Sequence, residues 1–299
     1  MANHIPLVVI DGGGTGSRLR AIDADGSVLG EATCGPSNLT YGVDRAWANL
    51  SDGLALLVEK TGRPVTGTAL WCGFAGGRSP ERQAAFRATD PIGASDIAIV
   101  TDGFASLVGA HGGRPGAVLA VGTGTAAFAL APDGTVASSS AWGYKIGDEG
   151  SGGWIGNRAV ALLARHLDGR LPQASSLFDA LKPVVGRDFN AIQTWLLQAD
   201  ATRFASLAPL VIETAASGDV MASRLLDDAA EELATALRAI DTGHAIALLG
   251  GLARTMEPRL PADIRARIVP AQGNALDGLQ IMARRGWRDE TRVELEAAS

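Results

Sequence analysis

The chain has 299 residues, of which 46% are hydrophobic and 19% are charged, and its formal net charge is −6. This length fits two domains of about 100–200 residues better than it fits one core. The acidic balance without a basic patch argues against nucleic-acid binding, and no apolar run reaches the roughly 18 residues of a membrane span.

Few side chains could bind a soft metal or form disulfides. Cys34 and Cys72 lie in apolar, strand-like stretches that are typical of buried free thiols, and the four histidines are scattered without ligand spacing. Any metal is therefore expected to have oxygen ligands, which suits Mg²⁺. The N-terminal stretch has neither the basic start nor the cleavage site of a signal peptide, so we expect a cytoplasmic protein without a membrane partner.

The first half of the chain alternates strand and helix patterns. Alternating or β-branched runs predict strands, and apolar residues at helical spacing predict helices. In chain order we expect strands over 7–11, 17–23 and 27–34, a helix over 42–60, a strand over 68–76, a helix over 79–88, a strand over 96–100 and a helix that follows Gly103.

The second half repeats the order seen at the N-terminus. A strand over 117–121, a Gly/Thr turn, a strand over 126–130 and a third strand after Asp133–Gly134 predict a duplicated unit. Further along, the sequence predicts helices over 151–240 and strands over 245–251 and 267–271.

This order predicts two α/β domains, each with a five-stranded mixed sheet flanked by helices. The first would span residues 1–114, joined by a C-terminal helix over 275–286, and the second would span 115–274 with a helical insertion over 151–240. Residues 112–116 (GGRPG) would form a hinge.

The first candidate site is the run Asp11-Gly12-Gly13-Gly14-Thr15, which follows a strand directly. Glycines let the backbone approach a ligand and present N–H groups to an anion, Thr15 adds a hydroxyl, and Asp11 could reach a hydrated Mg²⁺. The alternative is an ordinary glycine-rich hairpin.

The second candidate is the run Gly122-Thr123-Gly124-Thr125. It also begins a G-x-G-x-x-A pattern, but a dinucleotide-binding fold needs a helix after the turn, and here a strand follows. A Walker A loop is absent as well, because the sequence contains no Gly-Lys-Ser/Thr.

Two further segments carry carboxylates. Asp102 lies where a strand gives way to a helix, so it could be a helix cap or, facing a nucleotide, a base that orients an attacking hydroxyl. Residues 142–151 (WGYKIGDEGS) combine glycines, acidic groups and an aromatic, a set that suits a polyhydroxylated ligand. The alternative is a plain loop that leads into a helix capped by Ser151.

Together these motifs resemble the N-acetylglucosamine kinase family, in the BadF/BadG-type ATPase branch of the sugar kinase, Hsp70 and actin superfamily. The resemblance covers nearly the whole chain in motif order. It rests on six motifs: DGGGT at 11–15, GPSN at 35–38, TDG at 101–103, GTGT at 122–125, WGYKIGDEGS at 142–151 and LLGG at 248–251.

The resemblance implies two actin-like (ribonuclease H-like) domains with a cleft between them, and a role for each motif. Asp102 would be the catalytic base and Asp11 would hold Mg²⁺ through water. The residues implied in ATP binding are Gly12, Gly13, Gly14, Thr15, Thr123, Gly124, Thr125, Gly250 and Gly251. The residues implied in sugar binding are Asn38, Asp102, Trp142, Gly143 and Asp148.

The activity implied is transfer of the γ-phosphate of ATP to the 6-hydroxyl of an amino sugar, with N-acetylglucosamine favoured and a homodimer expected. One alternative is a glucosamine kinase. Another is an activator-type ATPase, but such proteins hold an iron–sulfur cluster with cysteines, and Cys34 and Cys72 are far apart and strand-embedded.

Overall fold

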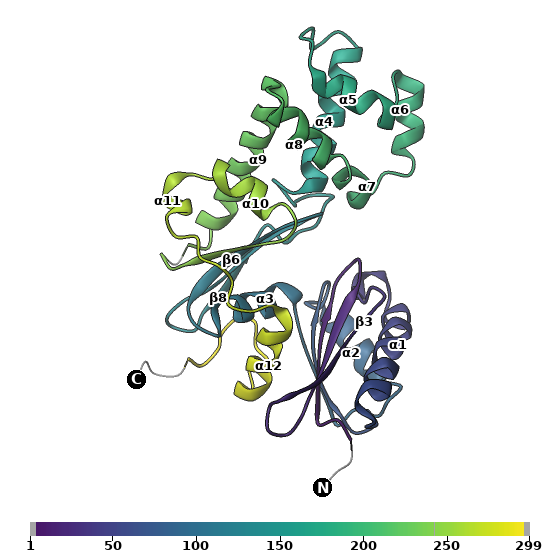
Figure 1. The fold of residues 1–299 in the computed structure, drawn as a ribbon, viewed down its shortest axis with the longest axis vertical. Coiled ribbons are helices and arrows are strands. Elements are labelled where there is room, and N and C mark those ends of the chain that lie inside the picture. The colour runs from purple at the N-terminus through teal and green to yellow at the C-terminus, as the bar shows by residue number, and fades with distance from the viewer. Residues whose placement is uncertain (1–3, 242, 296–299) are drawn as a thin grey trace. The chain divides into compact units, whose positions relative to one another are not determined.

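Two β-sheets organise the chain, and a computed structural model describes residues 4–241 and 243–295 (Figure 1). The contacts divide the chain into two units. Unit 1 draws on residues 1–116, 130–136 and 270–299, and unit 2 on residues 117–129 and 137–269. The predicted α/β class is confirmed. Within the described part of the chain, no helix is long and apolar enough to cross a membrane.

Unit 1 contains a five-stranded mixed sheet, as the alternating runs predict. Its strands are β1 (Leu7–Gly12), β2 (Ser17–Ile22), β3 (Val28–Cys34), β4 (Ala69–Phe74) and β5 (Asp96–Val100). The order is β3-β2-β1-β4-β5, with β1 antiparallel to β2 and parallel to β4. Because side chains alternate along a strand, Val8 and Ile10 face one layer of helices while Val9 and Asp11 face the other.

The helices α1 (Val43–Thr61) and α2 (Pro80–Ala88) pack on one face of this sheet. The predicted apolar stripe of α1 is buried, and Trp47 stacks on Phe86 with ring centroids 4.1 Å apart. The stripe is therefore core packing, as its spacing predicts.

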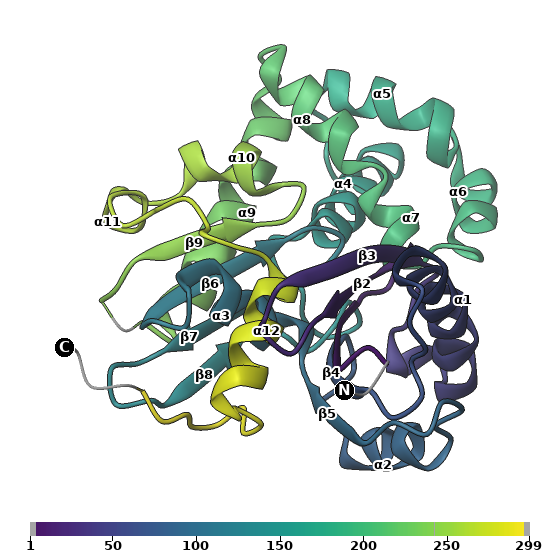
Figure 2. The same cartoon turned by 60° about the horizontal axis from the view of Figure 1, so that its bottom comes forward.

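On the other face, α3 (Asp102–His111) packs closely against α12 (Ala275–Arg285) (Figure 2). The two helices meet at glycines: a Cβ at Gly109 would lie 1.9 Å from the Asn274 carbonyl oxygen, and a Cβ at Gly278 would lie 1.9 Å from that of Ala105. Any larger side chain at either position would force the helices apart.

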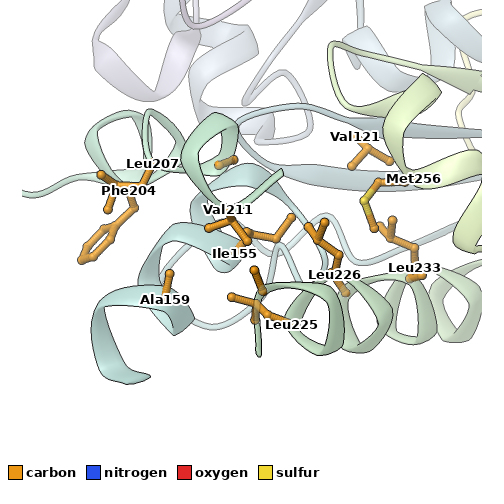
Figure 3. Packing of buried hydrophobic residues seen from close by; sticks show 14 of the residues in the cluster. Val121, Ile155, Ala159, Phe204, Leu207, Val211, Leu225, Leu226, Leu233 and Met256 are labelled. Atoms are coloured by element: carbon orange, nitrogen blue, oxygen red, sulfur yellow. The ribbon is translucent and has the colours of Figure 1, made fainter. Parts of the chain in front are cut away.

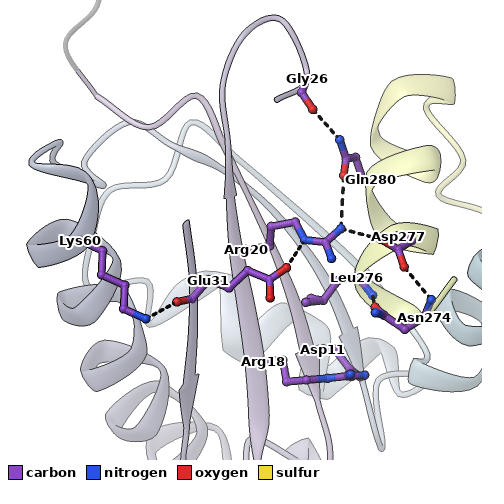
Figure 4. A network of polar contacts seen from close by, with 10 residues as sticks. All are labelled: Asp11, Arg18, Arg20, Gly26, Glu31, Lys60, Asn274, Leu276, Asp277 and Gln280. Carbon is purple, nitrogen blue, oxygen red and sulfur yellow. Dashed lines mark hydrogen bonds and ion pairs between the residues drawn. The ribbon is translucent and has the colours of Figure 1, made fainter. Parts of the chain in front are cut away.

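The α12 helix is also tied to β2 by a polar network (Figure 4). Arg20 donates to Glu31 at 2.6 Å and to Asp277 at 2.7 Å, and Gln280 donates to the Gly26 carbonyl oxygen at 2.8 Å. The Arg20 side chain is only 11% exposed, so its charge depends on these two carboxylates.

The second sheet has four strands, so the prediction of five is wrong. Its strands are β6 (Gly116–Val121), β7 (Thr125–Leu130), β8 (Val136–Ser139) and β9 (Ile246–Leu249), in the order β8-β7-β6-β9. The stretch 267–271 makes only an isolated bridge, between Ile268 and Ile246. Pro270 comes two residues later and has no N–H with which to continue the pairing.

The rest of unit 2 is helical over the predicted range. The helices are α4 (Gly152–Leu167), α5 (Ser176–Val185), α6 (Phe189–Leu196), α7 (Ala201–Ala205), α8 (Ala208–Ala216), α9 (Val220–Arg238), α10 (Ala253–Met256) and α11 (Ala262–Arg265). Figure 3 shows the apolar core shared by α4, α8 and α9, with Ile155, Val211, Leu226 and Leu233 buried in it. This core fixes the start of α4, which bears on the candidate site.

Candidate functional site

The first Gly/Thr turn joins β1 to β2 in unit 1. The Gly13 N–H donates to the Gly16 carbonyl oxygen at 3.1 Å, and Gly14 and Thr15 are exposed at the tip. Gly12 is needed for packing, since a Cβ there would lie 2.2 Å from Ser37 Oγ. At Gly13 the nearest atom to an added Cβ would be 3.4 Å away, so the turn itself has room at that position.

Asp11, the predicted Mg²⁺ residue, is already paired with an arginine. Its Oδ2 accepts hydrogen bonds from Arg18 Nε at 3.1 Å and Arg18 Nη2 at 2.5 Å (Figure 4). The antiparallel register places Arg18 directly opposite Asp11, which explains the contact.

Asp102 is the first residue of α3 and is not its cap. The cap is Thr101, whose Oγ1 accepts from the Phe104 N–H at 3.3 Å, while Asp102 Oδ1 accepts from the N–H of Gly103 at 2.9 Å. The helix-cap alternative for Asp102 is therefore wrong.

The pKa of Asp102 is raised to about 6, chiefly by burial and also by the negative charge of Asp11, while the Gly103 hydrogen bond opposes this rise. The neighbouring strand contributes Gly73, where a Cβ would lie 3.5 Å from the Asp102 Cα. Asp11 and Asp102 thus lie on the same side of the sheet, and their charges interact.

Asn38 lies beside the first turn. Its Oδ1 accepts from the Thr40 N–H at 2.8 Å and caps the short 3₁₀ helix Leu39–Tyr41, while its Nδ2 would be 3.9 Å from a Cβ at Gly14. The backbone fixes the oxygen of this amide and leaves the nitrogen on the side of the turn.

The second Gly/Thr turn joins β6 to β7 in unit 2 and is anchored to α4. The N–H groups of Gly152 and Gly153 donate to the carbonyl oxygens of Gly122 and Thr123 at 2.8 and 3.1 Å. Ser151 caps α4 as predicted, with its Oγ accepting from Trp154 N–H at 3.1 Å. The first N–H groups of α4 are therefore used to hold the turn.

Asp148 packs against this turn. Its carboxylate is buried and accepts from the Thr125 N–H at 3.3 Å, and a Cβ at Gly124 would lie 2.7 Å from its Oδ2. Burial raises the pKa of Asp148, and the charge of Glu149 adds to this, whereas the Thr125 hydrogen bond lowers it. The structure thus brings together a residue predicted for the sugar and a turn predicted for ATP.

The Thr125 hydroxyl is buried and has no hydrogen-bond partner among the described residues. A buried hydroxyl without a partner carries a desolvation cost of about 1–3 kcal/mol. Such an atom is suited to a ligand that supplies the missing partner.

Four other predicted residues lie in turns of unit 2. Trp142 is 76% exposed, and Gly143 has φ +81° and accepts from the Gly147 N–H at 2.9 Å. Gly250 has φ +92° and packs on Val121, since a Cβ there would lie 2.3 Å from the Val121 carbonyl oxygen. Gly250 therefore lies beside the start of the second turn, and Gly251 has open space where a Cβ would be.

No group of three or more acidic, histidine or cysteine side chains in the described ranges could by itself hold a metal ion. Sequence reasoning missed Thr101 as the cap of α3 and Glu290 as its partner. The Glu290 carboxylate accepts from the Thr101 N–H, and also from Thr101 Oγ1 at 3.2 Å. No local pattern signals a contact between residues 189 positions apart.

Comparisons with known proteins agree with this architecture. The profile of the BadF/BadG/BcrA/BcrD ATPase family matches residues 8–259. A glucosamine kinase from Vibrio cholerae is 29% identical over 282 residues, which cover 92% of this chain and 95% of the relative. An N-acetylmuramic acid/N-acetylglucosamine kinase from Clostridium acetobutylicum is 27% identical and covers 78% of each chain.

A crystal structure from Chromobacterium violaceum, of a candidate N-acetylglucosamine kinase, superimposes with a TM-score of 0.85. It is 36% identical, and the match covers 93% of this chain and 99% of that one. The predicted two-domain actin-like fold is confirmed by this likeness.

Proposed function

Because the chain belongs to the BadF/BadG/BcrA/BcrD ATPase family, we propose that it is an ATP-dependent amino sugar kinase. The reaction is transfer of the γ-phosphate to the 6-hydroxyl of the sugar, with N-acetylglucosamine as the favoured acceptor. The relatives named as glucosamine and N-acetylglucosamine kinases support the reaction class. The observation that carries the proposal is Asp102, a carboxyl group that the first turn of α3 holds beside Gly73 of β4 and whose pKa is raised to about 6.

Asp102 is suited to the role of general base. Above its pKa it is ionised and can accept the proton of the 6-hydroxyl as that oxygen bonds to the γ-phosphorus and ADP leaves. Phosphoryl transfer depends mostly on positioning, and the fixed first turn of α3 supplies that. A general base accepts the proton of its substrate most effectively when its pKa lies close to the working pH.

ATP is proposed to be bound by both Gly/Thr turns. Gly13, Gly14 and Thr15 offer backbone N–H groups and a hydroxyl at an exposed tip, and the unpartnered Thr125 hydroxyl offers a donor at the second turn. Gly250 and Gly251 would lie beside the adenosine, where Gly251 leaves space.

Mg²⁺ fits this donor set as an ion held mainly by phosphate and water. It needs only one or two protein carboxylates in nucleotide sites, and Asp11 supplies one, oriented by Arg18. When bound, the ion would neutralise charge on the phosphates. The role of Arg18 is to fix the Asp11 carboxylate.

The sugar is proposed to contact Asn38, Trp142, Gly143 and Asp148. An amide nitrogen, an exposed indole ring and a carboxylate together suit a ring with hydroxyl groups and an acetamido group. The expected homodimer and cytoplasmic location stay predictions of the same proposal.

The activator-type ATPase is the weaker alternative because of the cysteines. Cys72 is fully buried in the core of unit 1, where burial raises the pKa of its thiol, and Cys34 is only partly exposed. A thiolate ligand needs a lowered pKa and access to the cluster.

An ADP-release assay tests the function. The protein is given ATP and Mg²⁺ with N-acetylglucosamine, glucosamine, N-acetylmannosamine or glucose, and kcat/KM is measured for each. We expect N-acetylglucosamine to give the highest value. A preference for glucosamine would favour the alternative acceptor, and ADP release independent of every sugar would contradict a sugar kinase.

A further inference from the structure

Glu290 lies in the segment that follows α12 and reaches the start of α3. Its two carboxylate oxygens accept from the Thr101 N–H and from Thr101 Oγ1, the latter at 3.2 Å. Thr101 immediately precedes Asp102. The carboxylate is thus placed at the N-terminal end of α3, where the helix dipole favours an anion.

The Thr101 hydroxyl links Glu290 to the first turn of α3. A hydroxyl has one proton to donate, and Thr101 Oγ1 already accepts from the Phe104 N–H at 3.3 Å. Its proton is therefore directed to Glu290. This bond selects the Thr101 rotamer that caps the helix and so fixes the backbone on which Asp102 is carried.

Contacts on both sides hold Glu290 in place. Before it, Arg288 donates to Asp96 at 3.1 Å and lies over the Trp71 ring, 5.0 Å from the centroid. After it, the Val293 N–H donates to the Gly134 carbonyl oxygen at 2.8 Å. The carboxylate is therefore positioned by unit 1 itself.

The charges around Asp102 and Glu290 come from several parts of unit 1. Asp11 at the end of β1 raises the pKa of Asp102, and Arg18 on β2 partly neutralises Asp11. Burial raises the pKa of Glu290, the charge of Asp102 adds to this, and the Thr101 hydrogen bonds and Arg78 oppose it. An electrostatic interaction acts on both partners, so the Glu290 charge also disfavours ionised Asp102.

We propose that Glu290 is a positioning residue for Asp102, which holds the Thr101 cap of α3 and places a second negative charge beside the base. Only the expected effect of Glu290 on turnover rests on the proposed kinase function. The contact itself and its effect on the Asp102 carboxyl group do not depend on the substrate.

Kinetics of four variants test the catalytic consequence. Glu290→Ala should lower kcat roughly 10- to 100-fold, the cost of a slightly misplaced group, with the KM for ATP near that of the parent. Glu290→Gln should restore most of kcat, because its amide oxygen can accept from the Thr101 N–H while its NH2 group donates to Thr101 Oγ1. It should also move the acidic limb of the pH profile to lower pH. In an Asp102→Asn background, Glu290→Ala should have little further effect.

Asp289→Asn is the matched control, because it also removes one negative charge from the segment. Asp289 accepts from the Thr291 N–H and Oγ1, both at 2.7 Å, whereas the hydrogen bonds that the N–H and hydroxyl of Thr101 make among the described residues are with Glu290 and Phe104. We expect parent kcat and an unshifted pH profile.

Parent-like turnover in Glu290→Ala, or losses that multiply in the double variant, would overturn the proposal while the kinase function stands. If the parent phosphorylates no amino sugar, the function fails, and NMR titration of the Asp102 carboxyl carbon still decides the proposal. Its pKa should fall in Glu290→Gln and stay constant in Asp289→Asn. An equal Asp102 pKa in parent and Glu290→Gln would refute the role.

Discussion

The two Gly/Thr turns look like copies in sequence but are built differently. The turn at 12–15 ends in an exposed tip, and its carboxylate, Asp102, comes from a separate helix. The turn at 122–125 is held by the first N–H groups of α4, and its carboxylate, Asp148, bonds directly to Thr125. Unit 1 thus offers an open turn, whereas unit 2 offers a turn that is held in place by a helix.

This difference indicates that the two turns respond differently to a ligand. An open turn can adapt to a ligand at little cost, whereas a turn buttressed by a helix and a buried carboxylate is organised before the ligand arrives. The two carboxyl groups differ as well. Asp102 bonds to the backbone N–H of the residue that follows it in its own helix, whereas Asp148 bonds to the N–H of Thr125 in the turn. The predictions below test this contrast.

The largest effect is expected at Asp102. Asp102→Asn keeps the shape but cannot accept the hydroxyl proton, so kcat should fall roughly 100- to 10,000-fold. The folded-state pKa lies above the ordinary 3.8, so this group favours the fold at low pH, and that contribution is lost as pH rises through about 6. At pH 8 the variant should therefore show a melting temperature at or above that of the parent. A turnover within a few-fold of the parent would reject Asp102 as the base.

Asp148→Ala should act mainly on the sugar. Loss of its hydrogen bonds should weaken sugar binding by about 1–3 kcal/mol in calorimetry, with a smaller change in kcat than at Asp102. Because Asp148 also bonds to Thr125 in the turn proposed for ATP, the variant could instead affect ATP binding. Intact sugar binding with lost ATP binding would assign Asp148 to the nucleotide turn instead.

A matched pair of glycines compares the turns directly. Gly124→Ala places a Cβ 2.7 Å from the Asp148 carboxylate and should lower the free energy of unfolding by about 1–3 kcal/mol. Gly13→Ala has room, so its stability should stay within about 0.5 kcal/mol of the parent. Its ATP affinity should nevertheless fall roughly 10-fold, which is about 1.4 kcal/mol. If urea unfolding showed the same loss of stability in Gly124→Ala and Gly13→Ala, the proposed difference between the two turns would be wrong.

The smallest effect is expected at Thr125. Replacing its buried, unpartnered hydroxyl by a methyl group in Thr125→Val should leave stability unchanged or raise it by about 1 kcal/mol. ATP affinity should fall at the same time. A stability loss with unchanged ATP affinity would mean that the hydroxyl serves the fold and not the ligand.

Local patterns were sufficient to predict most elements. The alternating runs at β1–β3, the α1 stripe and the Ser151 cap depend on near neighbours in sequence. Contacts set by tertiary packing were not predictable in this way. Arg18 on Asp11 requires the strand register, and Glu290 on Thr101 requires the path of the chain after α12. The fifth strand that was predicted at 267–271 is missing because Pro270 ends the pairing, although the residues before it favour a strand.

The return of α12 to unit 1 has a consequence for synthesis on the ribosome. Arg20 and Asp277 are 257 positions apart, and the α3 face that receives α12 is translated before all of unit 2. At roughly 5–20 residues per second, that apolar face stays uncovered for on the order of ten seconds or more. Until α12 emerges, the nascent chain therefore exposes an apolar surface of the kind that chaperones bind.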